Sequence, residues 1–540
     1  MADEAMQAPV PEAPKNDNEK RRGVVLVAVL IVVASLSIVS YYFSDSMSSE
    51  QKASEYGHRN VQARALADSG IHYATALLSN PKSFTQKLAG NFWNNPDVFG
   101  NQALKASDGK LLGYFSIVAP ADPDDSAAAI CQYGVMDESS KINPNAMMKL
   151  DPTGQTLHDK LVKLPNMTDE IASNIVAFMG GSAGAAAGGV GNDYYGNLKP
   201  PYRIKGGPLD SIDELLLVKD VTPALLYGSD ANRNGFMDEG EQAAEGFDRG
   251  LSAYLTVYSR EQNCDPFTGE PYIFINNTDL KLLSENLTKK QIPDDMIKFL
   301  VMYQQYGPAN AAGKSQSTGS SLMSLLTGGA SSSSTKTVPG DLASYQPNYL
   351  KSLKYPLKSL FDLVGAQVGI TKVVPGAKGK SSTVTTVYSS PLNDLTRTAD
   401  LLTALFTVCT FTDPLTTPEL PPRINVNTAP AAVLTAIGLP DADVVKIVEA
   451  RRKLDPTQSI SNTPAWLVTE AQVSITTLKD FAPYLSARTQ VYRIQSIGYF
   501  DAKGPTIRVE AVIDTNIGRP RILAWRDLSE LGKGLPEVSK

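Results

Sequence analysis

An uncharged apolar run near the N-terminus constrains the fold of this chain most strongly. The run extends from Val24 to Phe43, is twenty residues long and contains no charged side chain. A helix of that length spans about 30 Å, the thickness of the hydrocarbon core of a bilayer. Basic residues precede it at positions 20–22, and acidic residues follow it at Asp45 and Glu50. We therefore expect a single membrane-spanning helix with its N-terminus in the cytoplasm and the body of the chain outside.

The helix is predicted to continue beyond the bilayer. No proline occurs between Pro14 and Pro81, so nothing interrupts a helix that runs to about Ser79. An intermittent apolar stripe follows the membrane part, at Met47, Ala53, Tyr56, Ala63, Leu66, Ile71, Ala74, Leu77 and Leu78. A secretory signal peptide fits poorly, because the run is long and no clear small-residue cleavage site follows it. The predicted helix is about 80 Å long, and half of it leaves the membrane.

The junction before the helix resembles that of type IV pilins and pseudopilins. A basic leader ends at Gly23, and the apolar helix begins at Val24. In that class a prepilin peptidase cuts after the glycine, so the resemblance implies cleavage between these two residues. The leader is long, and Val24 stands where the class usually has Phe or Met. An uncleaved signal anchor is the alternative.

Ala28 occupies the fifth position of the processed helix, where pilin subunits usually carry Glu. A carboxylate in a bilayer is costly unless it is paired, and in pilins it is thought to meet the N-terminal amine of a neighbouring subunit. A subunit at the filament tip has no neighbour above it. Absence of this Glu is typical of type II secretion protein K.

Three segments of the body share a short Ile-Asn pattern that precedes two helix-like stretches. They are Ile142–Asn145, Ile275–Thr278 and Ile424–Thr428. Asn after Ile suits the start of a helix, because its side chain caps free backbone N–H groups. In the third copy, Asp441 or Asp443 is expected to cap the second helix. The pattern indicates repeated hairpins of the helix-hairpin-helix kind.

Such hairpins often bind DNA backbones, but the charges here favour protein packing. Around the third copy the basic residues are offset by acidic ones, namely Arg423, Lys446, Arg451 and Arg452 against Asp441, Asp443 and Glu449. The formal net charge of the chain is -6. Because phosphate binding needs clustered Lys and Arg, we expect no nucleic-acid partner.

Residues 230–241 fit the EF-hand calcium loop at each defining position. The expected ligands are side-chain oxygens and one carbonyl, from Asp230, Asn232, Asn234, Phe236, Asp238 and Glu241. Gly235 supplies the sharp turn. The alternative is an ordinary polar turn, in which Asn and Gly serve backbone freedom. Because so many positions match, we expect a lone structural Ca²⁺ site.

Several segments resemble type II secretion protein K. They are Asp137–Asn145, Pro201–Tyr202, Ser211–Leu215, Tyr254–Ser259 and Ile424–Pro430. The resemblance implies an α+β fold in which a small antiparallel pilin-type sheet is interrupted by a large helical insertion. Segments with strand composition lie on both sides of that insertion, at Lys110–Val118, Ala129–Val135, Val491–Gly498, Thr506–Asp514 and Arg521–Trp525.

The expected organisation follows the chain from leader to closing strands. It comprises a prepilin leader (1–23), a transmembrane and amphipathic pilin helix (24–80), the first part of the sheet (81–141), a helical insertion with the calcium loop and two hairpin repeats (142–308), a flexible Gly/Ser linker (309–345), a helical insertion with the third repeat (346–490) and C-terminal strands that complete the sheet (491–540). The three cysteines have no CxxC spacing, and whether any of them pair stays open.

The resemblance implies a minor pseudopilin at the tip of the type II secretion pseudopilus, which acts in pseudopilus assembly and in protein secretion across the outer membrane. The expected location is the inner membrane, with the body in the periplasm. The expected partners are other minor pseudopilins, the major pseudopilin and the prepilin peptidase. No catalytic constellation occurs, so neither enzyme activity nor a small-molecule substrate is expected. The alternative is a minor pilin of a type IV pilus or DNA-uptake filament.

Overall fold

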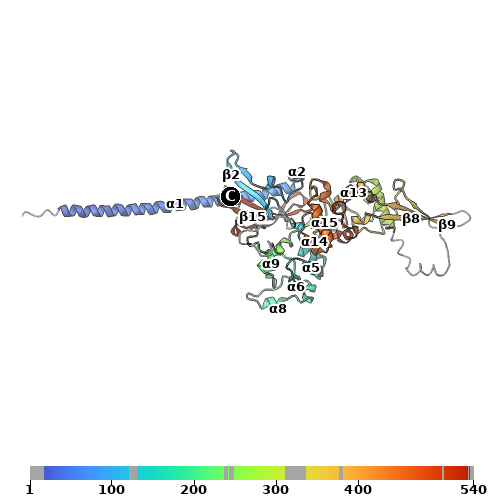
Figure 1. Cartoon of the computed structure of the whole chain (residues 1–540), viewed down its shortest axis with the longest axis horizontal. Coiled ribbons are helices and arrows are strands. Elements are labelled where there is room, and N and C mark those ends of the chain that lie inside the picture. Colours follow the sequence, from blue (N-terminus) through green and yellow to red (C-terminus); the bar gives the residue numbers. More distant parts are fainter. Residues whose placement is uncertain are drawn as a thin grey trace, which may run out of the picture.

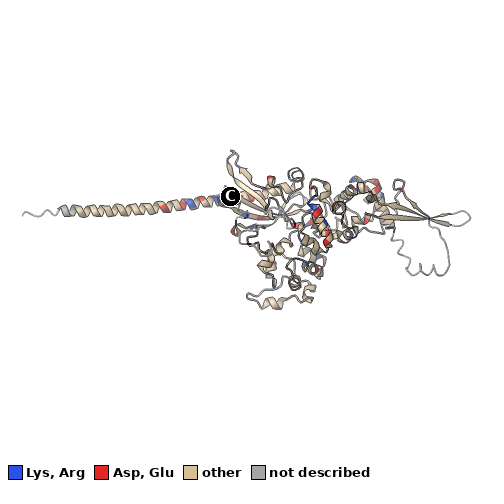
Figure 2. Ribbon diagram, in the orientation of Figure 1, with Lys and Arg blue, Asp and Glu red and all other residues tan. Residues whose placement is uncertain are grey.

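A long N-terminal helix stands apart from the body in the computed structural model, which describes residues 18–120, 124, 131–235, 241, 248–309, 336–375, 381–500, 504–532 and 534. Helix α1 spans Asn18–Ser79 and projects from the body as a rod (Figure 1). It is long and apolar enough to cross a membrane. Figure 2 shows a long uncharged stretch of α1 followed by charged residues where the helix nears the body. The predicted long apolar helix is confirmed, although it begins six residues before Val24.

The last turns of α1 pack on a sheet whose strands come from both ends of the chain. The buried side chains of this part of the helix are Ala63, Leu66, Ala67, Ile71, Ala74, Leu77 and Leu78. Glycine at the contact lets the two backbones approach closely: a Cβ at Gly498 would lie 2.1 Å from the Ala63 carbonyl oxygen. A Cβ at Gly70 would lie 2.1 Å from Ser496 Oγ. The small residues therefore set how deeply α1 sits on the sheet.

The sheet joins strands from the two ends of the chain. Its path is β1 (Gln102–Lys105), β2 (Leu111–Pro120), β14 (Val491–Tyr499), β15 (Ile507–Asp514) and β16 (Arg521–Asp527), with β3 (Cys131–Gln132) on β2 and β4 (Met136–Asp137) on β14. All pairs are antiparallel, and Ile497 of β14 lies opposite Ser116 of β2. Because β2 pairs directly with β14, the intervening chain is an insertion into one sheet. The predicted α+β class with an antiparallel sheet is confirmed.

The strand expected at Ala129–Val135 is realised only as β3 within the described residues. Residues 129 and 130 lie outside them. The chain bends at Gly134, where a Cβ would lie 2.2 Å from the Trp93 carbonyl oxygen. This close approach ends the strand and sends the chain into β4.

Helices from both halves of the insertion share one core beside the sheet. The first group is α4 (Pro144–Leu150), α5 (Gln155–Leu161), α6 (Asp169–Phe178), α7 (Ser182–Ala186), α8 (Asn192–Gly196) and α9 (Pro223–Tyr227). The second is α14 (Ala431–Ile437), α15 (Asp441–Arg451), α16 (Trp466–Thr469) and α17 (Ile475–Phe481). Their buried apolar side chains, including Trp466, form a single cluster. The two groups therefore fold as one unit, which we call the proximal lobe.

A second core lies farther from α1. It is built around α10 (Leu280–Lys289), α11 (Asp294–Tyr306) and α13 (Leu395–Val408). This distal module also contains a three-stranded sheet of β7 (Lys336–Pro339), β9 (Ser381–Ser389) and β8 (Gln367–Pro375), in that order. We expected a flexible Gly/Ser linker at 309–345 and a helical insertion with the third repeat at 346–490. Residues 336–339 instead form a strand, residues 310–335 lie outside the described part, and β8 and β9 form a hairpin that was not expected.

Consecutive helices follow each of the three Ile-Asn segments, but their first turns differ. Asn143 Oδ1 accepts the Ala146 N–H at 3.2 Å, as expected for a cap. Asn276 instead bonds Leu357, accepting its N–H at 2.9 Å and donating to its carbonyl at 2.9 Å. The expected cap at Asp441 or Asp443 is wrong: Pro440 is the N-cap of α15, and it makes no side-chain cap bond. That the three segments are copies of one hairpin unit stays a prediction.

Candidate metal loop and the ionic network beneath it

The described part of the predicted calcium loop is a tight turn after α9. Asp230 is buried and accepts two backbone N–H groups, from Asn234 at 3.0 Å and from Gly235 at 2.8 Å. Asn232 Oδ1 also accepts the Asn234 N–H, at 2.9 Å. The backbone of Gly235 is left-handed, with φ at +77°. The turn therefore has the sharp bend that the motif required of this glycine.

Glu241 closes the loop onto its own start. Its Oε1 accepts the N–H of Ala231 at 3.0 Å and that of Asn232 at 3.3 Å. Four of the six predicted ligands, Asp230, Asn232, Asn234 and Glu241, thus belong to one compact turn. The other two, Phe236 and Asp238, lie outside the described residues.

The charges of this turn fit a cation. Burial raises the pKa of Asp230, its bonds to Gly235 and Asn234 lower it, and the nearby Glu241 carboxylate raises it further. The available donors are carboxylate and amide oxygens, which are the ligands that Ca²⁺ prefers. Within the described residues, no group of three or more His, Cys, Asp or Glu side chains forms a metal cluster. The third carboxylate of the predicted set, Asp238, is one of the residues not described.

The sheet holds this turn from below through a buried arginine of β15. Arg508 is fully buried and donates through Nη1 to the carbonyl of Asn232 at 2.9 Å. Its Nη2 bonds the carbonyl of Arg233 and, at 3.1 Å, Oε1 of Gln495. Gln495 Nε2 in turn donates to Glu510 Oε2 at 3.1 Å. The predicted metal loop is therefore fastened to the strands that close the pilin-type sheet.

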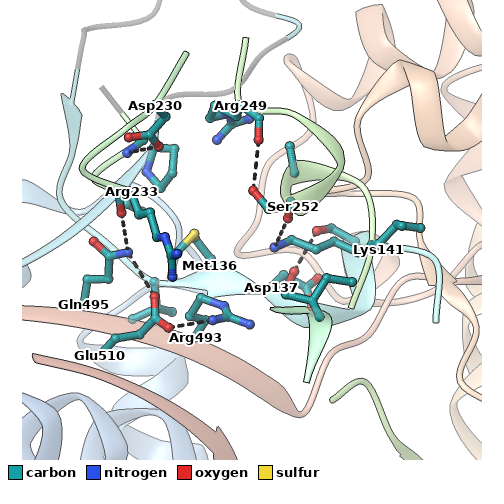
Figure 3. A pocket seen from close by; sticks show the side chains of 18 of the residues that line it. Met136, Asp137, Lys141, Asp230, Arg233, Arg249, Ser252, Arg493, Gln495 and Glu510 are labelled. Atoms are coloured by element: carbon teal, nitrogen blue, oxygen red, sulfur yellow. Dashed lines mark hydrogen bonds and ion pairs between the residues drawn. The ribbon is translucent and has the colours of Figure 1, made fainter. Parts of the chain in front are cut away.

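Glu510 continues the network toward the start of the insertion (Figure 3). Arg493 donates to Glu510 Oε1 at 2.7 Å and to Glu138 Oε1 at 2.7 Å. Burial opposes the charge of Glu138, but Arg493 and Lys141 outweigh it and lower the pKa of this carboxyl to about 2. Lys141 also donates to the Ser252 carbonyl at 3.0 Å. Arg493, Glu510 and Lys141 line a cavity of about 210 Å³ between the sheet, the loop and the proximal lobe.

Asp137, next to Glu138, lines the same cavity (Figure 3). It accepts bonds from Asn425 Nδ2 at 2.7 Å, Thr428 Oγ1 at 2.5 Å and the Ser139 N–H at 2.6 Å. No cation is among these partners, and burial raises its pKa to about 6, although these hydrogen bonds and one with Thr489 lower it. The Asn425 and Thr428 side chains belong to the third Ile-Asn segment. That segment therefore anchors the proximal lobe to the sheet.

Residues 140–227 match the family model for type II secretion system protein K. The chain carries a protein K domain. The resemblance predicted from the sequence is confirmed, and protein K is a structural component of that secretion system. No curated protein matches the chain.

The protein K match covers the helices from α4 to α9 and ends just before Asp230. The candidate metal loop, the distal module and the closing strands lie outside it. The network described above starts at Glu138, immediately before the matched segment, and returns to the sheet through Arg493 and Arg508. The ionic groups thus surround the protein K domain at the points where it joins the sheet.

The remaining residues singled out in the sequence have simpler surroundings. Gly23 and Val24, the predicted processing site, are exposed within α1, and nothing lies within 4 Å of a Cβ built on Gly23. Sequence reasoning missed Arg508, Glu510 and Arg493. Part of their signal was present: polar side chains recur at alternate positions in these apolar strands, Arg493 and Gln495 in 491–499 and Arg508 and Glu510 in 507–514. On one face of a sheet, such alternation brings the charges together.

Proposed function

We propose that this chain is the minor pseudopilin at the tip of a type II secretion pseudopilus. The protein K match over residues 140–227 carries the proposal. The protein acts in pseudopilus assembly and so in protein secretion across the outer membrane. Its partners are the other minor pseudopilins and the major pseudopilin. It is anchored in the inner membrane by α1, with the body in the periplasm.

The surface of α1 supports assembly through this helix. Every side chain from position 23 to 62 is exposed, including a run of Val, Leu and Ile residues. In the bilayer such a surface is in its preferred solvent, but outside the bilayer it needs a partner. From residue 63 to its end at Ser79, α1 is covered by the sheet on one side only. The buried positions of this part of the helix are 63, 66, 67, 70, 71, 74, 77 and 78. The exposed side is available to neighbouring pseudopilin helices.

Ala28 supports the terminal position in the filament. It removes the membrane carboxylate that a subunit needs when a neighbour's N-terminal amine lies above it. The tip position predicts very few copies of this protein per filament. Quantitative mass spectrometry of purified pseudopili measures the ratio, and a ratio near that of the major subunit would overturn the tip assignment.

Leader processing tests membership of the pseudopilin class directly. Cleavage between Gly23 and Val24 is expected to give a new N-terminus, and Gly23→Leu is expected to leave the leader attached and to abolish secretion. Gly57→Leu is a matched control, because this glycine lies on the same helix and also has nothing within 4 Å of its Cβ position. An intact leader on the wild-type protein, in cells with an active prepilin peptidase, would contradict the proposal.

Two turns of the insertion have different surroundings. The turn of the third hairpin supports packing against protein rather than nucleic acid, and the turn at Asp230 supports a structural Ca²⁺ site. At the third hairpin, the turn after α14 is covered by protein: Lys160 Nζ donates to the Ile437 carbonyl at 3.2 Å, and Phe481 lies 3.1 Å from the Cβ position of Gly438. A phosphate backbone has no access to a turn that is already occupied. The acidic loop, by contrast, has a donor set that suits a divalent cation.

We infer that Ca²⁺ bound by residues 230–241 fastens the insertion to the sheet. Binding to the folded state alone would add about 2.7 kcal/mol at a hundredfold excess over Kd. Glu241→Ala is expected to abolish the calcium-dependent rise in Tm, whereas Glu239→Ala, outside the predicted ligand set, should leave it. A melting curve unchanged by chelation, together with no calcium by calorimetry, would reduce the loop to a polar turn.

A further inference from the structure

The distal module ends in a two-stranded arm that leaves its core. Strands β8 and β9 pair without a register shift from Gln367↔Ser389 to Pro375↔Ser381. At the base, Val368 and Ile370 are buried in the distal core, whereas Val373 is 70% exposed and Val374 43% exposed. Figure 1 shows this arm at the end of the molecule opposite to α1. The outer half of β8 therefore has no layer of the described chain packed on it.

The outer edge of β8 is open along the same half. The Gln367 carbonyl accepts the Ala309 N–H at 2.6 Å, so this carbonyl points away from β9. Backbone groups alternate along an antiparallel strand, and the N–H and C=O groups of Gly369, Thr371 and Val373 therefore share this outer edge. In the described part of the chain no backbone group bonds to Thr371 or Val373 from that side.

This edge lacks most of the features that keep strands apart. Proteins usually protect an edge with a bulge, a short strand, charges or proline. The open edge of the pilin-type sheet has a register shift between β15 and β16, at Val512/Ile513. The β8–β9 pair has none over nine residues, and among its apolar and hydroxyl side chains β8 has only Gln367 and Lys372 as other polar residues and a terminal Pro375. A long regular edge of this kind can accept another strand.

The charged residues in the sequence of the arm indicate which kind of partner strand can pair with β8. Between residues 364 and 390 the charged residues are Lys372, Lys378 and Lys380, all of them basic. A second copy of the chain fits poorly, because antiparallel pairing of two β8 edges would place like charges from Lys372 close together. An incoming strand with Asp or Glu near Lys372 gains a cross-strand pair instead. Apolar side chains on the incoming strand would cover Val373.

We propose that the outer edge of β8, from Gly369 to Val373, binds an extended acidic segment of a partner protein by strand addition. The backbone of Thr371 and Val373 supplies the hydrogen bonds, and Lys372 selects the charge of the segment. The position of the arm, at the end opposite to α1, places this partner away from the membrane that holds the anchor. The proposal goes beyond the tip assignment and does not depend on it.

Two defined peptides test the proposal on the full-length protein in detergent. The first is a labelled ten-residue peptide that alternates Glu with Val and Thr, and the second carries Lys in place of each Glu. The acidic peptide is expected to bind about tenfold more tightly than the basic one, as measured by fluorescence anisotropy. Lys372→Glu is expected to reverse this preference. Equal binding of the two peptides would overturn the charge selection.

A backbone variant tests strand addition itself. The Thr371 N–H points outward, so Thr371→Pro removes an edge donor without removing a bond to β9. The variant is expected to bind the acidic peptide at least about tenfold more weakly than the wild type does. Amide exchange of β9 in the free variant shows whether the hairpin is intact. If Thr371→Pro disrupts it, peptide-induced protection of the wild-type Thr371 and Val373 amides decides instead.

Two results would overturn the proposal. The first is protection that appears elsewhere while these two amides exchange freely with the peptide bound. The second is a concentration-dependent dimer of the wild type that Thr371→Pro dissolves, which would assign the edge to a second copy of the chain. Protection of both amides by the acidic peptide, with a monomeric protein, supports it.

Discussion

The pilin-type sheet and the distal module both bury polar side chains, but of different kinds. Around the sheet the buried polar residues include the charged groups Glu138, Arg508, Glu510 and Asp514. In the described part of the distal module the buried polar residues are neutral, for example Gln304, Gln305, Thr398 and Thr403. Gln305 Nε2, for instance, donates to the Asn348 carbonyl at 2.8 Å and so holds a loop onto α11.

The difference corresponds to what each region joins. Glu138 and Arg493 meet across 355 positions of sequence, and Arg508 reaches the loop at Asn232 across 276 positions. Buried ion pairs add little stability relative to apolar packing, but an unpaired partner is costly. The ionic groups therefore make the junction specific, because any other placement of the insertion would leave charges unpaired. The distal module needs only an apolar core with bonded amides.

The largest expected effect comes from breaking the central ion pair. Arg493→Met leaves Glu510 buried without this cation and Glu138 with Lys141 alone, and it is expected to cost about 3–5 kcal/mol of unfolding free energy. Arg397→Met is the control in the distal module, where Arg397 pairs with Asp295 at 2.8 Å but is 43% exposed. It is expected to cost less than about 1 kcal/mol. Denaturant unfolding with amide exchange localises both effects, and equal losses would remove the contrast between the two regions.

A smaller effect is expected from matched strand glycines. Gly498→Ala would place a Cβ 2.1 Å from the Ala63 carbonyl oxygen, so α1 must move off the sheet. Overpacking of this kind costs about 1–3 kcal/mol. At Gly369 the atom nearest to an added Cβ is Thr385 Cγ2, a side-chain atom at 3.3 Å. Gly369→Ala should therefore change the unfolding free energy by about 0.5 kcal/mol at most. A difference in Tm of less than about 2 °C between the two variants would contradict the close-packed contact at α1.

The smallest effect is a pH dependence confined to the junction. The folded-state pKa of Asp137 is about 6, above its ordinary value of 3.8. The folded state therefore holds a proton that the unfolded state has released, and this stability is lost as pH rises through 6. Between pH 7 and pH 5 the wild type should gain on the order of 1 kcal/mol more than Asp137→Asn.

The measurement for Asp137 is amide exchange at both pH values. Protection of β14 should follow the difference between wild type and variant, whereas protection of α11 in the distal module should not. If the difference in protection between the wild type and Asp137→Asn does not change with pH, Asp137 titrates with its ordinary pKa.

Local sequence signals correctly predicted the elements whose structure depends on residues close by in the sequence. The helix over 24–79 and the strands at 491–498, 506–514 and 521–525 are observed within a few residues of their expected ends. Their signals were an uncharged run, uninterrupted helix propensity and clear turns. The tight turn at Asp230 and Gly235 likewise follows from side-chain and backbone preferences within six residues.

Features that depend on distant partners were missed. The β8–β9 hairpin has β-branched residues, but its outer half lies on no core, so its exposed and buried positions do not alternate. The cap predicted at Asp443 failed because this side chain instead contacts Lys446 and Thr477. The role of Arg508 required knowing which loop lies above β15, and no local pattern encodes that.

Pairing of β2 with β14 has a consequence for how the chain is made. The apolar face of α1 at Ala63, Ile71 and Ala74 is covered largely by β14 and β15, strands that the ribosome supplies only after residue 490. During synthesis and translocation, the insertion emerges and can collapse while that face is still uncovered. Closing the sheet last, over such a long loop, is intrinsically slow. The anchor helix is therefore exposed to wrong partners for most of biogenesis, and a chaperone or a companion subunit that shields it would raise the yield of folded protein.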